Sequence, residues 1–376
     1  IDREGPAAGA SAGNAGALAF TDILPLASPG VIRKAPRWLL DPLGPLSVPP
    51  RYALKIAPWM LRFWRASWPG QVRASTIAQT GLMALSKAAL EPFLAAHGLS
   101  SMLRRDGQLQ VYEGQAEFDA SLPSWAARAE AGIEFQHLKG DEIAGKQPGL
   151  DSRFTHATFT PGWFSISDPK DFTVALADRF RANGGVIEIA EATHLLPDGV
   201  DTSSGKMTGR VVLAAGAFSH LLARTAGVKI PLETERGYNT TLPASAIDLR
   251  CQVTFGGHGF VIAKLSSGIR VGGAVELGGL KLPPNYARAD AMLTKAKRFL
   301  PALDTSGGVQ WMGFRPSMPD SLPAIGPLPG QPNTLCAFGH GHLGLTQAAG
   351  TAEIIADLLA GKTPTIDLTP FSPSRF

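Results

Sequence analysis

The sequence predicts an α/β protein with two domains, one organised around a parallel sheet and the other around an antiparallel sheet. The chain has 376 residues, which exceeds the roughly 250–300 that a single core holds. Residues 168–219 place a helix before apolar strands, and residues 251–276 have the alternation of hairpins. With 44% hydrophobic and 18% charged residues, the composition is that of a globular protein.

The first third of the chain predicts a loop, a helix and a strand. Residues 10–17 (ASAGNAGA) are small and glycine-rich, which favours a loop whose backbone closely approaches a ligand. Residues 74–97 repeat apolar residues at helical spacing. The apolar face of that helix consists of Leu82, Leu85, Ala89 and Leu90. Leu109–Tyr112 follows an Asp-Gly turn and predicts a short strand.

The middle of the chain predicts helix-then-strand units. Asp168-Pro169 predicts the N-cap of a helix that continues to about Ala182, and residues 183–185 (NGG) end it. Residues 186–190 (VIEIA) then predict a strand, and residues 211–219 (VVLAAGAFS) predict a buried strand that leads into a glycine turn. Because this order with continuous apolar runs is typical of parallel strands, we expect a parallel sheet here.

The last third predicts an antiparallel sheet and a final helix. Residues 251–276 alternate around Gly256-Gly257 and Ser267-Gly268, which indicates hairpin strands. Residues 344–360 predict a helix that Gly361 ends.

Composition also limits the partners that we expect. The net charge of +4 is mild, and no basic run with interleaved aromatics indicates nucleic acid. Cys251 and Cys336 lie too far apart in sequence for a disulfide framework, which favours a reducing, cytoplasmic compartment. No Cys/His cluster has metal-ligand spacing, so we expect no metal site. No apolar run reaches the roughly 18 residues that a spanning helix needs.

The strongest local motif is residues 339–346 (GHGHLGLT), directly before an apolar helix. Its glycines let backbone N–H groups converge, and the helix N-terminus adds partial positive charge. The motif therefore predicts a site for an anion or an electron-rich ring edge. The alternative is a plain glycine-rich connection whose helix is capped by Thr346.

Two charged motifs are further candidates. Arg315, in Gly-Phe-Arg-Pro, presents a planar fork suited to a carboxylate, and the alternative is a structural ion pair. In Asp2-Arg3, the aspartate is placed as an acidic residue at the end of a strand that binds a ribose hydroxyl. The alternative is that its charge is simply solvated.

Six segments in this order resemble the glycine oxidase/D-amino-acid oxidase superfamily, and within it the bacterial D-amino-acid dehydrogenase small subunits and D-hydroxyproline dehydrogenases. The resemblance covers essentially the whole chain, and six matches in order and spacing make it specific. The segments are residues 1–3 (IDR), 10–16 (ASAGNAG), 211–219 (VVLAAGAFS), 272–276 (GGAVE), 313–316 (GFRP) and 339–346 (GHGHLGLT).

The resemblance implies an FAD-binding Rossmann-like domain of the glutathione-reductase type and an antiparallel-sheet substrate domain. We expect residues 1–30, 150–222 and 311–376 in the first, and residues 31–149 and 223–310 in the second. The second domain would include a helical basic-aromatic insertion near residues 31–70. The first strand and its G-x-G-x-x-G loop are absent, so we expect an N-terminally truncated version of the fold, with a short connection at residues 190–211.

The resemblance also implies roles for individual residues. Arg315 would hold a substrate carboxylate, and Tyr238 and His342 would face substrate, although Tyr238 fits a core tyrosine equally well. His258 fits a turn residue better than a site residue. The cofactor-binding residues would be Asp2, Arg3, Ser11, Asn14, Ala15, Gly16, Ala215, Gly216, Gly339, His340, Gly341, Gly344, Leu345 and Thr346.

The implied function is FAD-dependent dehydrogenation of an amino acid, a D-amino acid or D-hydroxyproline, by hydride transfer from the α-carbon to flavin N5. Two alternatives stay open. One is an oxidase that uses oxygen directly, and the other is a degenerate, non-catalytic flavin-fold subunit of a dehydrogenase complex.

Residues 52–68 combine aromatic and basic side chains without an acid. Trp and Arg settle at bilayer interfaces, so the segment predicts peripheral contact with the inner membrane and a quinone as electron acceptor. The alternative is that its rings pack on the flavin domain beneath the arginine stems. The residues concerned are Arg51, Lys55, Trp59, Arg62, Phe63, Trp64, Arg65 and Trp68.

Overall fold

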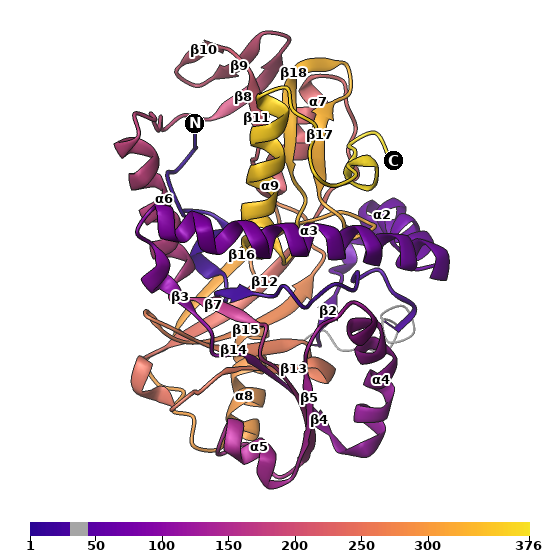
Figure 1. Cartoon of the computed structure of the whole chain (residues 1–376), viewed down its shortest axis with the longest axis vertical. Coiled ribbons are helices and arrows are strands. Elements are labelled where there is room, and N and C mark those ends of the chain that lie inside the picture. The colour runs from indigo at the N-terminus through magenta and orange to yellow at the C-terminus, as the bar shows by residue number, and fades with distance from the viewer. Residues whose placement is uncertain (31–43) are drawn as a thin grey trace.

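The computed structural model of the protein describes residues 1–30 and 44–376, and it confirms the α/β class. Figure 1 shows α3 (Pro69–Ala96) across the middle of the molecule. On one side of it lie α9 (Gly344–Leu359) and several short strands, and on the other side lies a large sheet.

The large sheet has nine strands and is mostly antiparallel, as the hairpin pattern predicts. Its order is β16-β12-β15-β14-β13-β4-β6-β5, and β2 (Leu46–Ser47) pairs in parallel with β15. Only β13 and β4 also run parallel among the pairs within this order. The strands are β4 (Gln108–Glu113), β5 (Gln136–Lys139), β6 (Phe154–Thr160), β12 (Glu233–Leu242), β13 (Gln252–Phe255), β14 (Phe260–Leu265), β15 (Gly268–Glu276) and β16 (Val309–Ser317).

Helices cover the large sheet and complete its core. The helices α4 (Gly114–Glu130), α5 (Asp141–Lys146) and α8 (Ala287–Phe299) lie beside it in Figure 1. Phe255 and Phe299 are almost fully buried, with ring centroids 5.2 Å apart. Burying a side chain of this size contributes about 1.5–3 kcal/mol. Arg288 of α8 also donates hydrogen bonds to Ser47 Oγ of β2 and to the Val275 carbonyl of β15, so α8 stabilises the sheet by both packing and hydrogen bonds.

The smaller sheets contain the predicted parallel pairing. The strand β11 (Val211–Leu213) pairs in parallel with β18 (Gln331–Phe338), which pairs antiparallel with β17 (Ala324–Leu328). This sheet is therefore mixed rather than wholly parallel. Residues 190–211 contain the antiparallel strands β8 (Ala192–Leu196), β9 (Gly199–Thr202) and β10 (Gly205–Thr208). A third sheet has the order β1-β7-β3 (Ala17–Leu18, Phe164–Ile166 and Leu103–Arg104).

The strand predicted at residues 186–190 is wrong. Within the described residues this segment forms only an isolated parallel bridge between Ile189 and Asp2. A strand needs a ladder of paired backbone groups, and here the pairing is confined to the two hydrogen bonds that Asp2 makes with Glu188 and Ala190. Val186 is consequently 81% exposed.

The predicted helices are confirmed and are joined closely. Asp168 caps α6 (Pro169–Ala182) by accepting a 2.8 Å hydrogen bond from the Lys170 backbone N–H. A Cβ placed on Gly350 of α9 would lie 2.5 Å from Ser86 Oγ of α3. The two long helices therefore cross at a contact that requires glycine.

The basic-aromatic segment folds as α2 (Ala53–Ala66), whose two faces differ. Trp59 and Phe63 are buried and stack with their centroids 5.2 Å apart, whereas Trp64 and Trp68 are about half exposed. The alternative that the rings pack on the protein thus holds for one face. Residues 31–43 of the predicted insertion lie outside the described residues. No described helix has the length and hydropathy of a membrane span.

The predicted domain boundaries stay a prediction. The strands β6 and β16 overlap the segments that we assigned to the cofactor domain, yet both pair in the large sheet. The chain therefore crosses between the two parts through paired strands.

A buried ion pair fixes the loop that follows β15. Arg236 and Glu276 are almost fully buried, with Nη1 and Oε1 3.1 Å apart. The same guanidinium donates to the carbonyls of Gly279 and Leu282, both at 2.6 Å. One cation therefore joins β12 to residues 277–283.

Removing the charge of Glu276 should destabilise the protein strongly. Glu276→Gln leaves the Arg236 cation buried without its counter-ion, which costs about 3–5 kcal/mol of unfolding free energy. The exposed pair between Arg181 and Asp178 is the control, since Asp178→Asn should cost less than about 1 kcal/mol. Urea unfolding followed by tryptophan fluorescence measures both, and equal small losses would contradict the structural role of the buried pair.

Candidate active site

The loop between β18 and α9 is held against the end of β16. Ser317 and His340 form an antiparallel bridge, and the Gly341 N–H donates to the Pro316 carbonyl at 2.7 Å. Gly339 has φ +85°, and a Cβ there would lie 2.7 Å from Met318. Only glycine fits this approach, so the motif brings α9 to the strand that carries Arg315.

The first turn of α9 fits the edge of an electron-rich ring. The N-cap residue, Leu343, provides no side-chain hydrogen bond to the first N–H groups of the helix. Gly341 has φ +56°, and no atom lies within 4 Å of the point that a Cβ would occupy, so its backbone borders open space. Gln347, in the next residues of the helix, is buried with neither amide atom hydrogen bonded. Free donors, the helix dipole and an unpaired amide together suit the flavin ring that the resemblance implies.

Thr346 does not cap α9, so the alternative that we gave for it is wrong. Its hydroxyl accepts a 3.0 Å hydrogen bond from the Ala19 N–H and donates to the Ala17 carbonyl at 3.3 Å. Thr346 therefore ties α9 to β1, while Leu345 and Gly344 precede it in the first turn. The helix N-terminus stays available because its threonine is used elsewhere.

His340 is a neutral, packed side chain. Burial lowers its pKa to about 4, and its Nε2 lies 3.0 Å from Thr351 Oγ1 of α9. The imidazole is uncharged at neutral pH, so it supports the loop and cannot serve as a cation for substrate.

The large sheet holds the glycine-rich loop of residues 10–16 by hydrogen bonds to the carbonyls of that loop. Asn239 Nδ2 donates to the Gly13 carbonyl at 3.0 Å, and Arg270 Nη1 donates to the Asn14 carbonyl at 2.5 Å. The Gly16 carbonyl accepts from the Ile166 N–H at 2.8 Å. With these carbonyls engaged, the loop has a defined orientation toward a ligand on its other side.

The rest of this loop is short-range structure. Residues Ala10–Gly13 form a 3-10 turn, and the Ser11 carbonyl accepts from the Asn14 N–H at 3.3 Å. The Asn14 side chain accepts from the Gly16 N–H at 2.8 Å, around the half-buried Ala15. The Asn14 side chain therefore fixes its own loop, and a cofactor would meet the loop backbone.

The N-terminal motif lies beside the turn that follows β11. The Arg3 guanidinium stands 4.6 Å over the Phe218 ring, and the Asp2 carboxylate accepts from the Gly5 N–H at 2.8 Å. Gly216, after Ala215, has φ +54° and open space at its Cβ position. The structure thus brings together two segments that are more than two hundred residues apart and that we predicted to share a ligand.

Arg315 is a half-buried cation that lies opposite Glu235 of the neighbouring strand β12. Its Nη1 donates to the Ala274 carbonyl at 2.9 Å, and within residues 1–30 and 44–376 it forms no ion pair. A Cβ on Gly237 would collide with its guanidinium, so that glycine makes room for the fork. Burial lowers the pKa of Arg315, and the charge of Glu235 counteracts this. Such a group is suited to receive a carboxylate.

Tyr238 lies in the core of the large sheet. It is 1% exposed, and its hydroxyl accepts a 3.0 Å hydrogen bond from the Asn285 N–H. This is the satisfied core tyrosine that we gave as the alternative. His258 pairs with Glu113 at 3.1 Å beside the hairpin turn, as expected of a turn residue.

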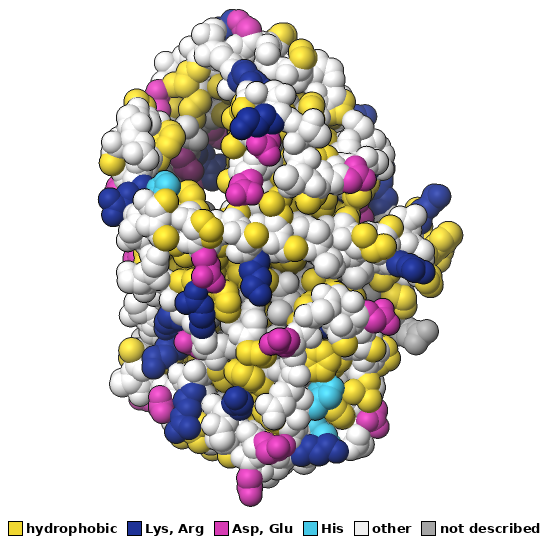
Figure 2. Space-filling view, viewed as in Figure 1, with side chains coloured by type: hydrophobic (Ala, Val, Ile, Leu, Met, Phe, Trp, Pro, Cys, Tyr) yellow, Lys and Arg dark blue, Asp and Glu magenta, His cyan; other side chains and the backbone are white. Residues whose placement is uncertain are grey.

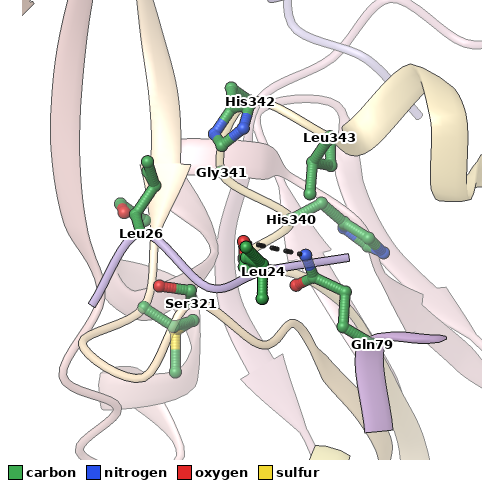
Figure 3. Close-up of a pocket in the computed structure, with 11 residues that line it drawn as sticks. Leu24, Leu26, Gln79, Ser321, His340, Gly341, His342 and Leu343 are labelled. Atoms are coloured by element: carbon green, nitrogen blue, oxygen red, sulfur yellow. Dashed lines mark hydrogen bonds between the residues drawn. The ribbon is translucent and has the colours of Figure 1, made fainter. Parts of the chain in front are cut away.

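His342 lies at the edge of a small cavity of about 10 Å³. Figure 3 shows its imidazole above Gly341, whereas His340 leaves the loop in another direction. The cavity also borders Leu24 and Gln79 and has room for about one water molecule.

A second, wider groove of about 510 Å³ runs along α9. It is lined by Val212, His340 and small or apolar residues of the helix, without a charged side chain. Because a substrate carboxylate needs a cation, we place the substrate on the Arg315 side of the loop.

Sequence reasoning missed three residues of the candidate site, which are Asn239, Arg270 and Asp22. The Asp22 carboxylate lies 3.4 Å from His342 Nε2. Asn239 and Arg270 contact the loop from 226 and 256 residues away. No local motif marks them. The pairing of β12 with β15 places both on the same face of the sheet, because Thr241, two residues after Asn239, lies opposite Arg270.

Comparisons with known proteins agree with this geometry. The chain is 34% identical over 381 residues to a D-amino-acid oxidase of Bradyrhizobium diazoefficiens, an alignment that covers 98% of this chain and 90% of that protein. It is 29% identical to a D-amino acid dehydrogenase of Rhizobium johnstonii, with 100% and 93% covered. The glycine oxidase structure from Geobacillus kaustophilus shares the fold, with a TM-score of 0.76, 22% identity, and 100% and 91% covered.

The family model described as FAD dependent oxidoreductase matches residues 1–358, nearly the whole chain. Its cofactor is FAD, whose ring suits the uncapped first turn of α9. The chain therefore belongs to this family of FAD-dependent oxidoreductases.

Proposed function

We propose that the protein oxidises an amino acid at its Cα–N bond, with the carboxylate of the substrate held by Arg315. The observation that carries this proposal is the half-buried guanidinium, which donates to two carbonyls and forms no direct ion pair among the described residues, although the charge of Glu235 acts on it. Arg315 lies one residue before Pro316, whose carbonyl accepts the hydrogen bond from Gly341 in the loop that precedes α9. A carboxylate on Arg315 would therefore place its α-carbon toward the cofactor loop.

The protein supplies position and electrostatics for this reaction. FAD, when bound, accepts a hydride from the α-carbon. The loop of residues 339–341 and the first turn of α9 would hold the ring, and the loop of residues 10–16 would lie along the cofactor. Arg315 would fix the substrate at one end, so that the reacting C–H bond is oriented before the reaction.

We infer that the substrate is a D-amino acid, with D-hydroxyproline as one candidate. The support is the similarity of the chain to a D-amino-acid oxidase and to a D-amino acid dehydrogenase. A single cationic clamp fixes the carboxylate of either enantiomer, so handedness depends on which face of the α-carbon meets the ring.

We further propose that the electron acceptor is a quinone and that the outer face of α2 and α3 meets the cytoplasmic side of the inner membrane. Residues 51–90 contain six Lys or Arg residues and no Asp or Glu. Leu54 is 93% and Leu61 64% exposed, beside the half-exposed Trp64 and Trp68. Figure 2 shows basic and hydrophobic side chains on the corner where these helices project. Cations with exposed apolar side chains suit an anionic bilayer interface.

Arg315→Lys should weaken substrate binding and leave the flavin spectrum unchanged. Lysine keeps the charge but lacks the bidentate fork, so the apparent KM for an amino acid should rise at least about tenfold, or about 1.4 kcal/mol, which is less than the about 2–5 kcal/mol that truncating such a pair costs. The amide of the same amino acid is the control, because its turnover should hardly change. Equal KM values in wild type and variant would rule out the carboxylate clamp.

Arg270→Gln should loosen FAD. The variant removes the charged donor to the Asn14 carbonyl, a bond of about 1.5–3 kcal/mol, so the Kd for FAD should rise by about tenfold or more. Release of fluorescent FAD on dilution measures it. Arg250→Gln is the control, since the exposed Arg250 side chain lies just before β13 and pairs with Asp248. A Kd unchanged by Arg270→Gln would mean that the sheet does not position this loop for FAD.

Wild type should sediment with anionic liposomes at low salt and dissociate as salt shortens the Debye length from about 10 Å at 0.1 M. Replacing Leu61, Trp64 and Trp68 with Ser should release it without loss of activity toward a soluble dye. Phe180→Ser, on the exposed face of α6, is the matched control and should leave binding intact. Wild type that ignores liposomes at low salt would indicate a soluble acceptor.

A further inference from the structure

We propose that Asp22 and His342 form a carboxylate–imidazole pair that removes a proton from the substrate amine, and that Arg128 positions this pair. The inference rests on the proposed function. It assigns His342 a catalytic role at the reacting nitrogen and makes Asp22 and Arg128 positioning residues.

Asp22 is held from three sides. Its Oδ2 lies 3.4 Å from His342 Nε2, and its Oδ1 accepts a 3.0 Å hydrogen bond from Arg128 Nη2. Gln79 Nε2 donates to the Asp22 backbone carbonyl at 2.8 Å. Arg128 is in turn fixed by the Thr21 carbonyl, which accepts from its Nε at 3.0 Å. The carboxylate therefore has little freedom to turn away from the imidazole.

The charge of Asp22 is secured by the same contacts. Burial raises the pKa of Asp22, but the hydrogen bond from His342 and the charge of Arg128 outweigh it and hold that pKa below its ordinary value. An ionised carboxylate only accepts hydrogen bonds. His342 Nε2 must then carry the proton toward Asp22, which leaves Nδ1 as the free acceptor.

The same loop brings His342 to the end of β16. The Ser317–His340 bridge and the bond from Gly341 to Pro316 join the residues that lie just after Arg315 and just before His342. The His342 side chain keeps 35% exposure, so substrate and water can reach it. A substrate whose carboxylate lies on Arg315 thus has a proton acceptor on the adjoining loop.

The reaction requires that the substrate nitrogen first lose a proton. An amino acid arrives as an ammonium ion, whose nitrogen has no lone pair to assist loss of hydride from the α-carbon. The ammonium N–H bond breaks, the proton forms a bond to His342 Nδ1, and Asp22 stabilises the resulting imidazolium. The neutral amine then loses a hydride, with two electrons, to the flavin and becomes an iminium, and the imidazolium returns its proton to water.

Four charged or titratable groups surround this step. Asp22 faces the imidazole directly, and Arg128 of α4 lies behind that carboxylate. His340, on the same loop, is neutral because burial lowers its pKa to about 4, and Arg315 is on β16. His342 itself combines a partly exposed imidazole with a fixed carboxylate neighbour.

The test is the pH profile of anaerobic flavin reduction, measured by stopped flow with an amino acid that reduces the wild-type holoenzyme. His342→Gln should slow reduction at pH 7 by about 10²-fold or more. The rate should recover as pH rises toward the pKa of the substrate amine, since the free amine needs no base. Asp22→Asn removes the charge that favours the imidazolium, so the ascending limb should move to lower pH and the maximal rate should fall. Asp22→Glu should restore most of both.

His258→Gln is the matched control, because His258 also pairs with a carboxylate but lies on a distant hairpin. Its profile should equal that of wild type. Unchanged profiles in His342→Gln and Asp22→Asn, with normal flavin spectra, would overturn this inference alone. Wild-type flavin that no amino acid reduces would overturn the proposed function and this inference with it. A uniform rate loss at every pH in both variants would also overturn the proton-accepting role.

Discussion

The contact between the loop that precedes α9 (residues 339–343) and the end of β16 is the constraint on which the proposed site depends. One bridge, Ser317 with His340, and one hydrogen bond, from Gly341 to Pro316, join the last helix to the large sheet. Gly339 allows this approach because no side chain fits against Met318. The free N–H groups of α9 and the guanidinium of Arg315 are positioned by the same junction. This junction therefore fixes the position of the proposed cofactor-binding groups relative to the proposed substrate-binding group.

In the proposed site, the large sheet would position the cofactor as well as the substrate. Asn239 and Arg270 hold the carbonyls of the glycine-rich loop, while Arg315 extends from β16 over Gly237 of the neighbouring strand. A change in the packing of this sheet would thus affect both cofactor binding and substrate binding. The buried Arg236–Glu276 pair, which secures the loop after β15, stabilises the same region.

Local sequence signals predicted much of the fold, whereas features that depend on pairing between distant segments could not be predicted from them. The cap at Asp168, the hairpins and the last helix each depend on residues close in sequence, and all are confirmed. The strand at residues 186–190 failed because strand formation needs a partner that apolar residues alone do not specify. The motifs predicted the flavin loop and Arg315 as candidates. They could not predict that Asp22 faces His342, since 320 residues separate them.

The most direct test of the proposed activity is anaerobic reduction of the bound flavin by a panel of D- and L-amino acids that includes the hydroxyprolines, each paired with its amide. We predict that at least one D-amino acid bleaches the flavin absorbance within a single turnover and that its amide, which cannot engage Arg315, does so far more slowly. The proposed activity would be contradicted if a chemical reductant reduced the bound flavin and no amino acid did. Equal rates with acids and amides would contradict the role of Arg315.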